Sequence, residues 1–342
     1  MKKTGKVVLV TVTASVSILL IALFFPTWTS SIAGDHSIST MQQVKINGTN
    51  QEIMIRGQDK RNPVLLFVHG GPGNSEIPYA KKYQHLLEKN FTVVNYDQRG
   101  TGKSYHFNEA HPNISSDLLA DDLIAITDYL KKNVTNKKVI LVGHSYGTYV
   151  ATQAAAKAPE KYEAYVGIGQ MSNTVESEMD SLDYVLKQAT KAENKEDITA
   201  IKKVQSKVEN GEAFTPRDLV MKYGGGARQI DNPEKNLFQL ALTTEYNLLD
   251  AIGYLRGIGF YQFPLVQEAL KNPLTEKVTA LDLPVYFVMG KYDYMTSAKV
   301  AKHYFDSLDA RQKEFLTFKK SAHYPQFEEP KKFSDWMVKT FK

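Results

Sequence analysis

The feature that most constrains the fold is the segment of residues 139–147, which reads Val-Ile-Leu-Val-Gly-His-Ser-Tyr-Gly. Its apolar, β-branched run predicts a buried strand, and the alanine-rich stretch of residues 149–158 predicts a helix. The G-x-S-x-G pentapeptide between them is typical of a sharp turn, in which glycines leave room for a strained serine. Ser145 is therefore expected at the carboxyl edge of a sheet, beside helix N–H groups that can hold an oxyanion. The pentapeptide also arises by chance, so it needs support from the rest of the chain.

Strands and helices alternate on both sides of this turn. Apolar runs predict strands at residues 64–68, 91–96, 165–168, 284–289 and 314–318. Amphipathic patterns predict helices at residues 80–87, 116–130, 297–308 and 327–341. Asn47-Gly48, flanked by alternating apolar residues, predicts a hairpin. This alternation predicts an α/β fold with a mostly parallel, doubly wound sheet and helices on both faces.

The alternation stops for about 110 residues after residue 168. Residues 175–189 and 198–208 each carry a helical stripe, while glycines and prolines, Pro264 among them, interrupt the rest. No strand of comparable quality is predicted in this region. We therefore predict a helical cap at residues 171–281, inserted into a core that consists of residues 41–170 and 282–342.

A serine nucleophile needs a base that takes its proton and an acid that orients the base. In a doubly wound sheet these groups are expected on loops that follow later strands. Asp293 and His323 each follow one of the last two predicted strands. The order Ser145, Asp293, His323 is similar to that of the α/β-hydrolase arrangement, and these three residues are predicted to form a catalytic triad. The predicted cap precedes the strand that leads to the acid.

A second glycine-rich loop supplies a candidate oxyanion donor. It reads His-Gly-Gly-Pro at residues 69–72 and follows an early strand. The backbone N–H groups of Gly71 and of Tyr146, the residue after the serine, are predicted to form the oxyanion hole. The alternative is a glycine turn without a chemical role. His69 and His144 flank the predicted site and are expected to be packing or hydrogen-bonding groups.

The N-terminus predicts a membrane segment. Three lysines precede residues 7–25, which carry no charge. As a helix this run is about 29 Å long, close to the roughly 30 Å hydrocarbon core of a bilayer. The lysines predict a cytoplasmic N-terminus, so the catalytic domain is expected outside the cytoplasm. We predict a retained anchor at residues 1–28 and a linker at residues 29–40; the alternative is a signal peptide cleaved near Ala33 and a secreted protein.

Composition limits the chemistry further. The chain has no cysteine, which excludes disulfides and thiolate chemistry. Its net charge of +5 comes from lysines scattered among acids, so no nucleic-acid partner is predicted. Residues 100–104 read Gly-Thr-Gly-Lys-Ser, but Asp97 stands where a phosphate loop needs glycine, so no nucleotide partner is predicted either. The eight histidines are dispersed, so neither a metal nor another cofactor is predicted.

These motifs together resemble the prolyl iminopeptidase family of α/β hydrolases. The resemblance covers about residues 40–342 and rests on His-Gly-Gly-Pro-Gly at residues 69–73, Asp-Gln-Arg-Gly at residues 97–100 with Gly102 and Ser104, the serine pentapeptide, Asp293 and His323. It implies the α/β-hydrolase fold and the release of N-terminal residues, often proline, from short peptides through an acyl-enzyme. Cap glutamates of such proteins hold the free amine of the substrate, and Glu176, Glu178 and Glu245 are the candidates here.

Other functions remain open at this point. Many bacterial members of the family carry Trp where this chain has Tyr146, and the cap matches no family pattern, so the proline preference is open. The fold also hosts esterases, and a carboxylesterase that acts on a small ester is the second hypothesis. The third hypothesis is a catalytically silent α/β-hydrolase domain that binds a partner.

Overall fold

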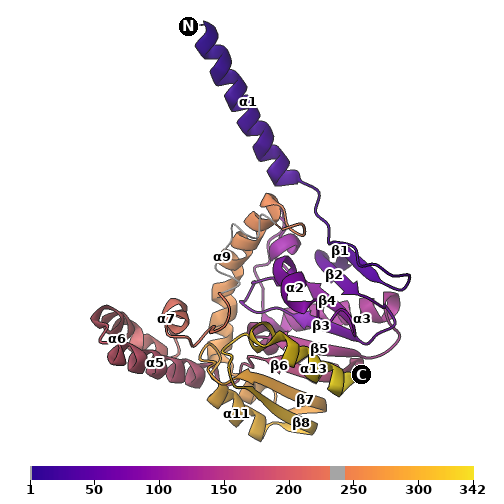
Figure 1. Cartoon of the computed structure of the whole chain (residues 1–342). Coiled ribbons are helices and arrows are strands. Elements are labelled where there is room, and N and C mark those ends of the chain that lie inside the picture. The colour runs from indigo at the N-terminus through magenta and orange to yellow at the C-terminus, as the bar shows by residue number, and fades with distance from the viewer. Residues whose placement is uncertain (1, 232–242) are drawn as a thin grey trace.

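An eight-stranded sheet forms the centre of the molecule in a computed structural model, which describes residues 2–231 and 243–342 (Figure 1). The strands lie in the order β1-β2-β4-β3-β5-β6-β7-β8. Their bounds are β1 (Ile38–Ile46), β2 (Thr49–Gly57), β3 (Val64–Val68), β4 (Thr92–Tyr96), β5 (Val139–His144), β6 (Tyr162–Ile168), β7 (Ala280–Gly290) and β8 (Asp309–Phe318). Strand β2 runs antiparallel to β1 and β4, and all other pairs are parallel. The predicted mostly parallel sheet is confirmed.

Helices separate most of the parallel strands. Their bounds are α1 (Lys2–Phe24), α2 (Ile77–Gln84), α3 (Ser116–Asn133), α4 (Tyr146–Lys157), α5 (Thr174–Lys191), α6 (Lys195–Glu209), α7 (Arg217–Lys222), α9 (Leu248–Lys271), α10 (Leu274–Lys277), α11 (Ala298–Ser307), α12 (Pro325–Glu328) and α13 (Pro330–Phe341), with short 3-10 turns η1 (Gly102–Ser104) and η2 (Pro159–Lys161). Residues 232–242 of the predicted cap lie outside the described residues.

The two faces of the sheet are covered by different helices. Val64, Leu66 and Val68 of β3 share a buried cluster with residues of α3, α4 and α11. The alternate residues, Leu65 and Phe67, share a second cluster with residues of α13. Because neighbouring side chains of a strand point to opposite faces, this division shows that β3 is buried on both sides. The sheet is therefore doubly wound, as predicted.

The hairpin between β1 and β2 closes at the predicted dipeptide. Asn47 and Gly48 have φ angles of 43° and 92°, and Ile46 pairs with Thr49 across them. Positive φ at both central residues is the type I′ geometry that suits the twist of a two-residue hairpin. Strand β1 begins at Ile38, inside the range expected for the linker, because its pairing with β2 extends that far.

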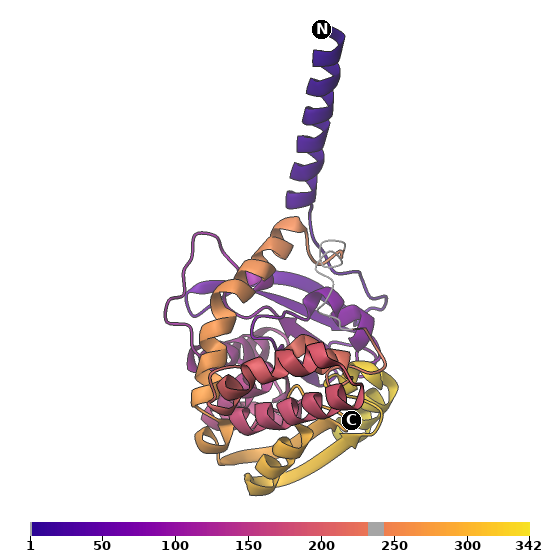
Figure 2. The same ribbon diagram turned by 90° about the vertical axis from the view of Figure 1, so that its left-hand side faces the viewer.

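Among the described residues between β6 and β7 the chain forms helices α5, α6, α7, α9 and α10 and no strand. Helices α5 and α6 lie side by side at one end of the molecule (Figures 1 and 2). Pro264 does not end a helix as expected but lies inside α9. Tyr261 and Leu265, on either side of it, are buried, and this packing compensates for the backbone hydrogen bond that proline cannot donate.

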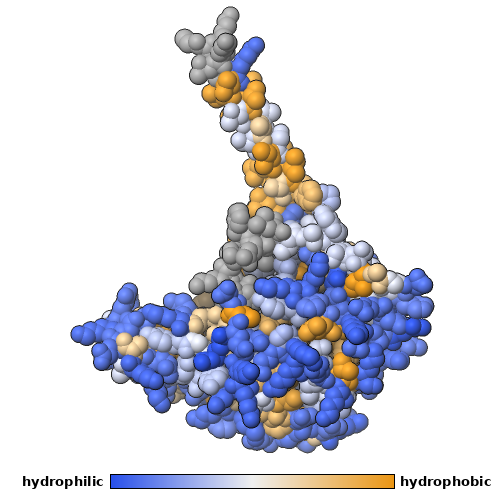
Figure 3. Space-filling model, viewed as in Figure 1, coloured by the Kyte–Doolittle hydropathy of each residue, from blue (hydrophilic) through white to orange (hydrophobic). Residues whose placement is uncertain are grey.

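Helix α1 projects from the body of the protein, and its surface is largely hydrophobic where the body is mostly hydrophilic (Figures 1 and 3). Residues Lys6–Phe24 have a mean hydropathy of 2.7, and none of this stretch is buried in the protein. By length and composition the helix can cross a membrane, a property that it shares with signal sequences.

Candidate active site

Ser145 occupies the sharp turn between β5 and α4. Its backbone has φ 55° and ψ −126°, a strained conformation for a residue with a side chain. A Cβ at Gly147 would lie 1.9 Å from the carbonyl oxygen of Val68, and one at Gly70 would lie 2.7 Å from the Cβ of Ser145. The turn therefore needs glycine at these positions, because backbone and nucleophile approach too closely for any larger residue.

Asp293 and His323 meet on the loops that follow β7 and β8. The Oδ2 atom of Asp293 lies 3.0 Å from Nδ1 of His323, and both side chains are almost completely buried. The other carboxylate oxygen of Asp293 accepts hydrogen bonds from the backbone N–H groups of Met295 and Thr296, at 2.9 Å and 3.0 Å. Since β7 and β8 are parallel neighbours, their carboxyl ends bring these loops together. A proton on Nδ1 that points to Asp293 leaves Nε2 as the base.

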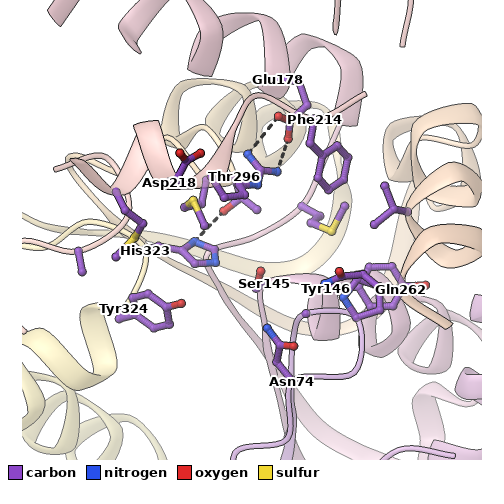
Figure 4. A pocket seen from close by; sticks show the side chains of 18 of the residues that line it. Asn74, Ser145, Tyr146, Glu178, Phe214, Asp218, Gln262, Thr296, His323 and Tyr324 are labelled. Carbon is purple, nitrogen blue, oxygen red and sulfur yellow. Dashed lines mark hydrogen bonds and ion pairs between the residues drawn. The ribbon is translucent and has the colours of Figure 1, made fainter. Parts of the chain in front are cut away.

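Ser145 and His323 line the same cavity, and Figure 4 shows both side chains at its floor. The predicted oxyanion residues, Gly71 and Tyr146, line it as well. Tyr146 is the first residue of α4, so its N–H group has no partner within the helix. Gly71 has a φ of 113°, and a Cβ there would lie 2.6 Å from the backbone nitrogen of Asn74. The structure thus brings the predicted nucleophile, base and oxyanion donors around one cavity.

The glycine loop is held by the Asp-Gln-Arg segment. The side chain of Gln98 donates a hydrogen bond to the carbonyl oxygen of His69 (2.8 Å), and its backbone N–H donates to Nε2 of His69 (3.1 Å). Burial lowers the pKa of His69 to about 4, so its ring is neutral and can accept this bond. Arg99 forms a buried ion pair with Asp122 (2.7 Å) that fixes the segment. Gln98 and Arg99 therefore have a structural role, which the sequence pattern alone did not reveal.

His144 links the loop of His323 to α2. Its Nδ1 lies 2.9 Å from Oε1 of Glu76, and its Nε2 lies 3.2 Å from the carbonyl oxygen of His323. The rings of His144 and His323 are 5.0 Å apart. His144 therefore supports the loop of His323, the predicted base, through hydrogen bonds, in the kind of role expected for it.

Thr296 is a site residue that the sequence did not reveal. Its hydroxyl donates a hydrogen bond to Oδ2 of Asp293 (3.0 Å) and lies 3.3 Å from Nδ1 of His323 (Figure 4). It also lines the cavity. The only available signal was a threonine three residues after the acid, and threonine is too common in such loops to be singled out.

The three candidate glutamates lie in different surroundings. Glu178 lines the cavity, but it is buried, and Arg217 binds both of its carboxylate oxygens at 2.5 Å and 3.0 Å (Figure 4). Burial raises the pKa of Glu178. Glu176 is exposed in the first turn of α5, and Glu245 is buried, but neither is a lining residue of this cavity. Among the three, only Glu178 is brought to the predicted nucleophile, and its carboxylate is already bound.

The cavity has a volume of about 2100 Å³. Helix α9 contributes one wall, and charged residues on α7 and the loop after it, such as Arg217, Asp218 and Arg228, contribute another. Ligand pockets usually have volumes of about 300–1,000 Å³, so this space exceeds the needs of a small ligand. Within residues 2–231 and 243–342, no three His, Cys, Asp or Glu side chains are grouped so that they could hold a metal ion.

Known proteins resemble the chain along most of its length. The family model described as the alpha/beta hydrolase fold matches residues 63–330. A protein of Bacillus subtilis named "Probable aminopeptidase YbaC" is 31% identical over 302 residues, which cover 87% of this chain and 95% of that protein. A proline iminopeptidase of Saccharolobus solfataricus is 25% identical and covers 82% of this chain and 84% of its own length. The crystal structure of a proline iminopeptidase of Mycobacterium smegmatis superposes with a TM-score of 0.61 at 16% identity, covering 88% of this chain and 97% of that one.

Proposed function

Because the chain belongs to the α/β hydrolase family, we propose that it is a serine hydrolase of the prolyl iminopeptidase type that releases N-terminal residues from short peptides. One observation carries the proposal: a strained Ser145 shares a cavity with His323, and His323 is hydrogen-bonded to the buried Asp293. The similarity to proteins named as aminopeptidase and proline iminopeptidase supports the choice of a peptide substrate.

The proposed reaction has two steps. The hydroxyl oxygen of Ser145 attacks the carbonyl carbon of the first residue while Nε2 of His323 takes the proton, and Asp293 stabilises the resulting imidazolium. The N–H groups of Gly71 and Tyr146 hold the negative oxygen of the tetrahedral intermediate. The C–N bond then breaks as His323 returns the proton to the leaving amine, which yields an acyl-enzyme. Water, deprotonated by His323, then attacks the acyl carbon. The bond from that carbon to the Ser145 oxygen breaks, His323 returns the proton to this oxygen, and the first residue leaves with its new carboxyl group.

The surroundings of Glu178 favour a second candidate, a carboxylesterase. A peptidase of this type needs a carboxylate that holds the substrate's amine, and the carboxylate of Glu178 is already bound to Arg217. An ester has no such amine, so the same triad could act on it without a free carboxylate in the cavity. In that case Ser145 forms the same acyl-enzyme and the leaving group is an alcohol.

Labelling and substrate profiling test both candidates. We expect a fluorophosphonate probe to label the protein and Ser145→Ala to abolish labelling, because the serine oxygen is the attacking atom. Ser181→Ala is the matched control, since Ser181 is a buried serine of α5 that is not a lining residue of the cavity. Turnover of aminoacyl-naphthylamides supports the peptidase, whereas turnover of short acyl esters alone rejects it in favour of the esterase. Absence of labelling in the unmodified protein rejects both.

We also propose that α1 is a retained membrane anchor with the catalytic domain outside the cytoplasm. The residues after α1 are bound to the domain: Trp28 N–H donates to the carbonyl oxygen of Thr244 (2.8 Å). The guanidinium of Arg56, which forms an ion pair with Glu88 (2.6 Å), donates to the carbonyl oxygen of Ser30 (2.7 Å). Cleavage near Ala33 would remove both Trp28 and Ser30, and the loss of Ser30 would deprive the buried Arg56 of one hydrogen-bond acceptor, at a cost in stability.

Fractionation and mass spectrometry test the anchor. The full chain is expected to stay in the membrane pellet after alkaline carbonate extraction. Mass spectrometry of the mature protein is expected to detect residues that lie before residue 25. Protease added to intact cells is expected to digest the domain, because the lysines before α1 retain the N-terminus inside. A soluble protein that begins near Gly34 would contradict the proposal.

A further inference from the structure

One side of α9 carries an apolar stripe along most of the helix. The stripe consists of Leu248, Ile252, Leu255, Gly259, Phe263 and Val266. Successive members are three or four residues apart, which places them on the same side of an α-helix. Leu255 and Phe263 expose 47% and 71% of their surface to solvent. Apolar side chains of this size lose about 1.5–3 kcal/mol when they remain in water rather than buried, so these two exposed side chains on one side of the helix indicate a surface that receives an apolar ligand.

The stripe connects the end of α1 with the cavity. At its N-terminal end, the side chain of Asn247 donates a hydrogen bond to the carbonyl oxygen of Phe25, directly after α1 (3.1 Å). Both ribbon views show the start of α9 beneath the end of α1 (Figures 1 and 2). At the other end, Gly259, Phe263 and Val266 line the cavity that contains Ser145. From Leu248 to Val266 the helix rises about 27 Å, so the stripe spans the distance between the two places.

The opposite side of α9 is fixed to the core, so the stripe cannot turn inward. Cβ atoms at Gly253 and Gly257 would lie 2.8 Å and 2.4 Å from the carbonyl oxygens of Gly102 and Gly100. Helix and loop therefore touch backbone to backbone at these two glycines. At Gly259, on the stripe, a Cβ would meet nothing within 4 Å. The stripe is exposed at Leu255, Gly259 and Phe263, whereas Leu248, Ile252 and Val266 are half-buried.

We propose that the substrate is an amphiphile with a long alkyl chain, which reaches Ser145 from the bilayer along this stripe. The proposal rests on the serine nucleophile and on the anchor proposed above. An alkyl chain that leaves a bilayer for water loses about 0.8 kcal/mol per CH₂ group, and contact with apolar side chains reduces that loss. A cavity of about 2100 Å³ has room for such a chain beside the scissile ester or amide group.

The test compares two probes on the full chain in phosphatidylcholine vesicles. One is an ethyl fluorophosphonate, and the other is a hexadecyl fluorophosphonate that partitions into the bilayer; the labelling rate of Ser145 is measured for each. The variant is Leu255→Gln, because Leu255 lies on the stripe between α1 and the cavity and is not a lining residue, and glutamine retains helix propensity. Phe260→Gln is the matched control, since Phe260 is 58% exposed on the same helix but lies outside the stripe.

We expect Leu255→Gln to slow labelling by the hexadecyl probe about fivefold and to leave the ethyl probe unchanged. Phe260→Gln is expected to change neither rate. Equal hexadecyl rates in the Leu255 variant and the unmodified protein would overturn the proposal, as would an equal loss with both probes, which indicates damage to the cavity itself. If neither probe labels the unmodified protein, the proposed nucleophile fails, and the inference fails with it.

Discussion

Thr296 determines how firmly the proposed base is oriented. Its hydroxyl donates to Asp293, and the same carboxylate oxygen of Asp293 contacts Nδ1 of His323. The hydroxyl thus fixes the carboxylate that fixes the imidazole. Hydrogen bonds to the partner of a reacting side chain commonly affect activity, because they restrict the orientation of that side chain. We therefore regard Thr296 as a positioning residue.

Thr296→Val tests this role. Valine has a similar shape but no hydroxyl, so we expect kcat to fall about 5- to 10-fold, the value of one lost hydrogen bond, with little change in KM. The pH profile of kcat/KM is expected to move, because the hydrogen bonding of Asp293 changes. Thr296→Ser, which keeps the hydroxyl, is expected to restore the profile. A profile that does not move in the valine variant would indicate a purely structural threonine.

Candidate site residues that follow a predicted strand could be identified from the sequence. Residues whose role depends on a hydrogen-bond partner far away in the chain could not. Asp293 and His323 could be proposed because each comes directly after an apolar run. Gln98 and Thr296 could not, because their partners lie in other loops and a single hydroxyl or amide leaves no pattern. Glu178 shows the same limit, since Arg217, its partner, is 39 residues away on another helix.

At the element scale, the two sides of α9 differ in whether they have room for a side chain larger than that of glycine. Gly257 lies against the backbone of the loop at residues 100–102, whereas Gly259, two residues later, faces open space. The sequence gives no hint of this difference, because both are glycines in the same helix. It also suggested a break at Pro264, which tertiary packing overrides.

Alanine substitutions at Gly257 and Gly259 measure the difference in space between the two sides of α9. Gly257→Ala is expected to lower the free energy of unfolding by about 1–3 kcal/mol, because the new methyl group meets a backbone oxygen that cannot move away. Gly259→Ala is expected to raise it by up to about 1 kcal/mol, since alanine favours the helix and meets no neighbour. Denaturant titration of the detergent-solubilised chain, followed by circular dichroism, gives both values. Equal effects of the two substitutions would contradict the packing of α9 described here.

At the scale of the whole molecule, the centre of the sheet could be predicted because strands such as β3, β4 and β5 are buried along their whole length and read as short apolar runs. The helices between β6 and β7 could be predicted as helical but not arranged, since a helical stripe does not specify which neighbour it packs against. The junction after α1 was expected to be a linker, yet Arg56 and Thr244 bind it to the domain. Such long-range hydrogen bonds are invisible to local patterns.

A buried acid of β2, Glu52, is expected to make stability depend on pH. Burial raises the pKa of Glu52 from 4.5 to about 7; nearby Lys103 opposes the shift, while Asp97 and Asp250 add to it. The folded protein therefore binds more protons than the unfolded chain between about pH 4.5 and 7. The contribution of Glu52 to stability is fully present below about pH 4.5 and is lost as the pH rises through 7. Asp97, whose burial raises its pKa to about 6, acts in the same direction.

Glu52→Gln is expected to raise the free energy of unfolding at pH 8 by about 1–3 kcal/mol relative to the unmodified protein, and to change it little at pH 4.5. Denaturant midpoints of the full chain in detergent at the two pH values provide the measurement. Glu276→Gln, at an exposed glutamate, is the control and is expected to leave the pH dependence as it is. An unchanged difference between pH 4.5 and pH 8 in the Glu52 variant would refute the role of this side chain.

The helices over the cavity all belong to the segment between β6 and β7, and these two strands are parallel neighbours in the sheet. Ser145 precedes this helical segment in the chain, and Asp293 and His323 follow it. The helical segment between β6 and β7 can therefore be exchanged as a unit without altering the loops that carry the proposed triad. Chimaeras that graft a foreign helical segment between β6 and β7 would inherit their substrate preference from the donor and their chemistry from the recipient.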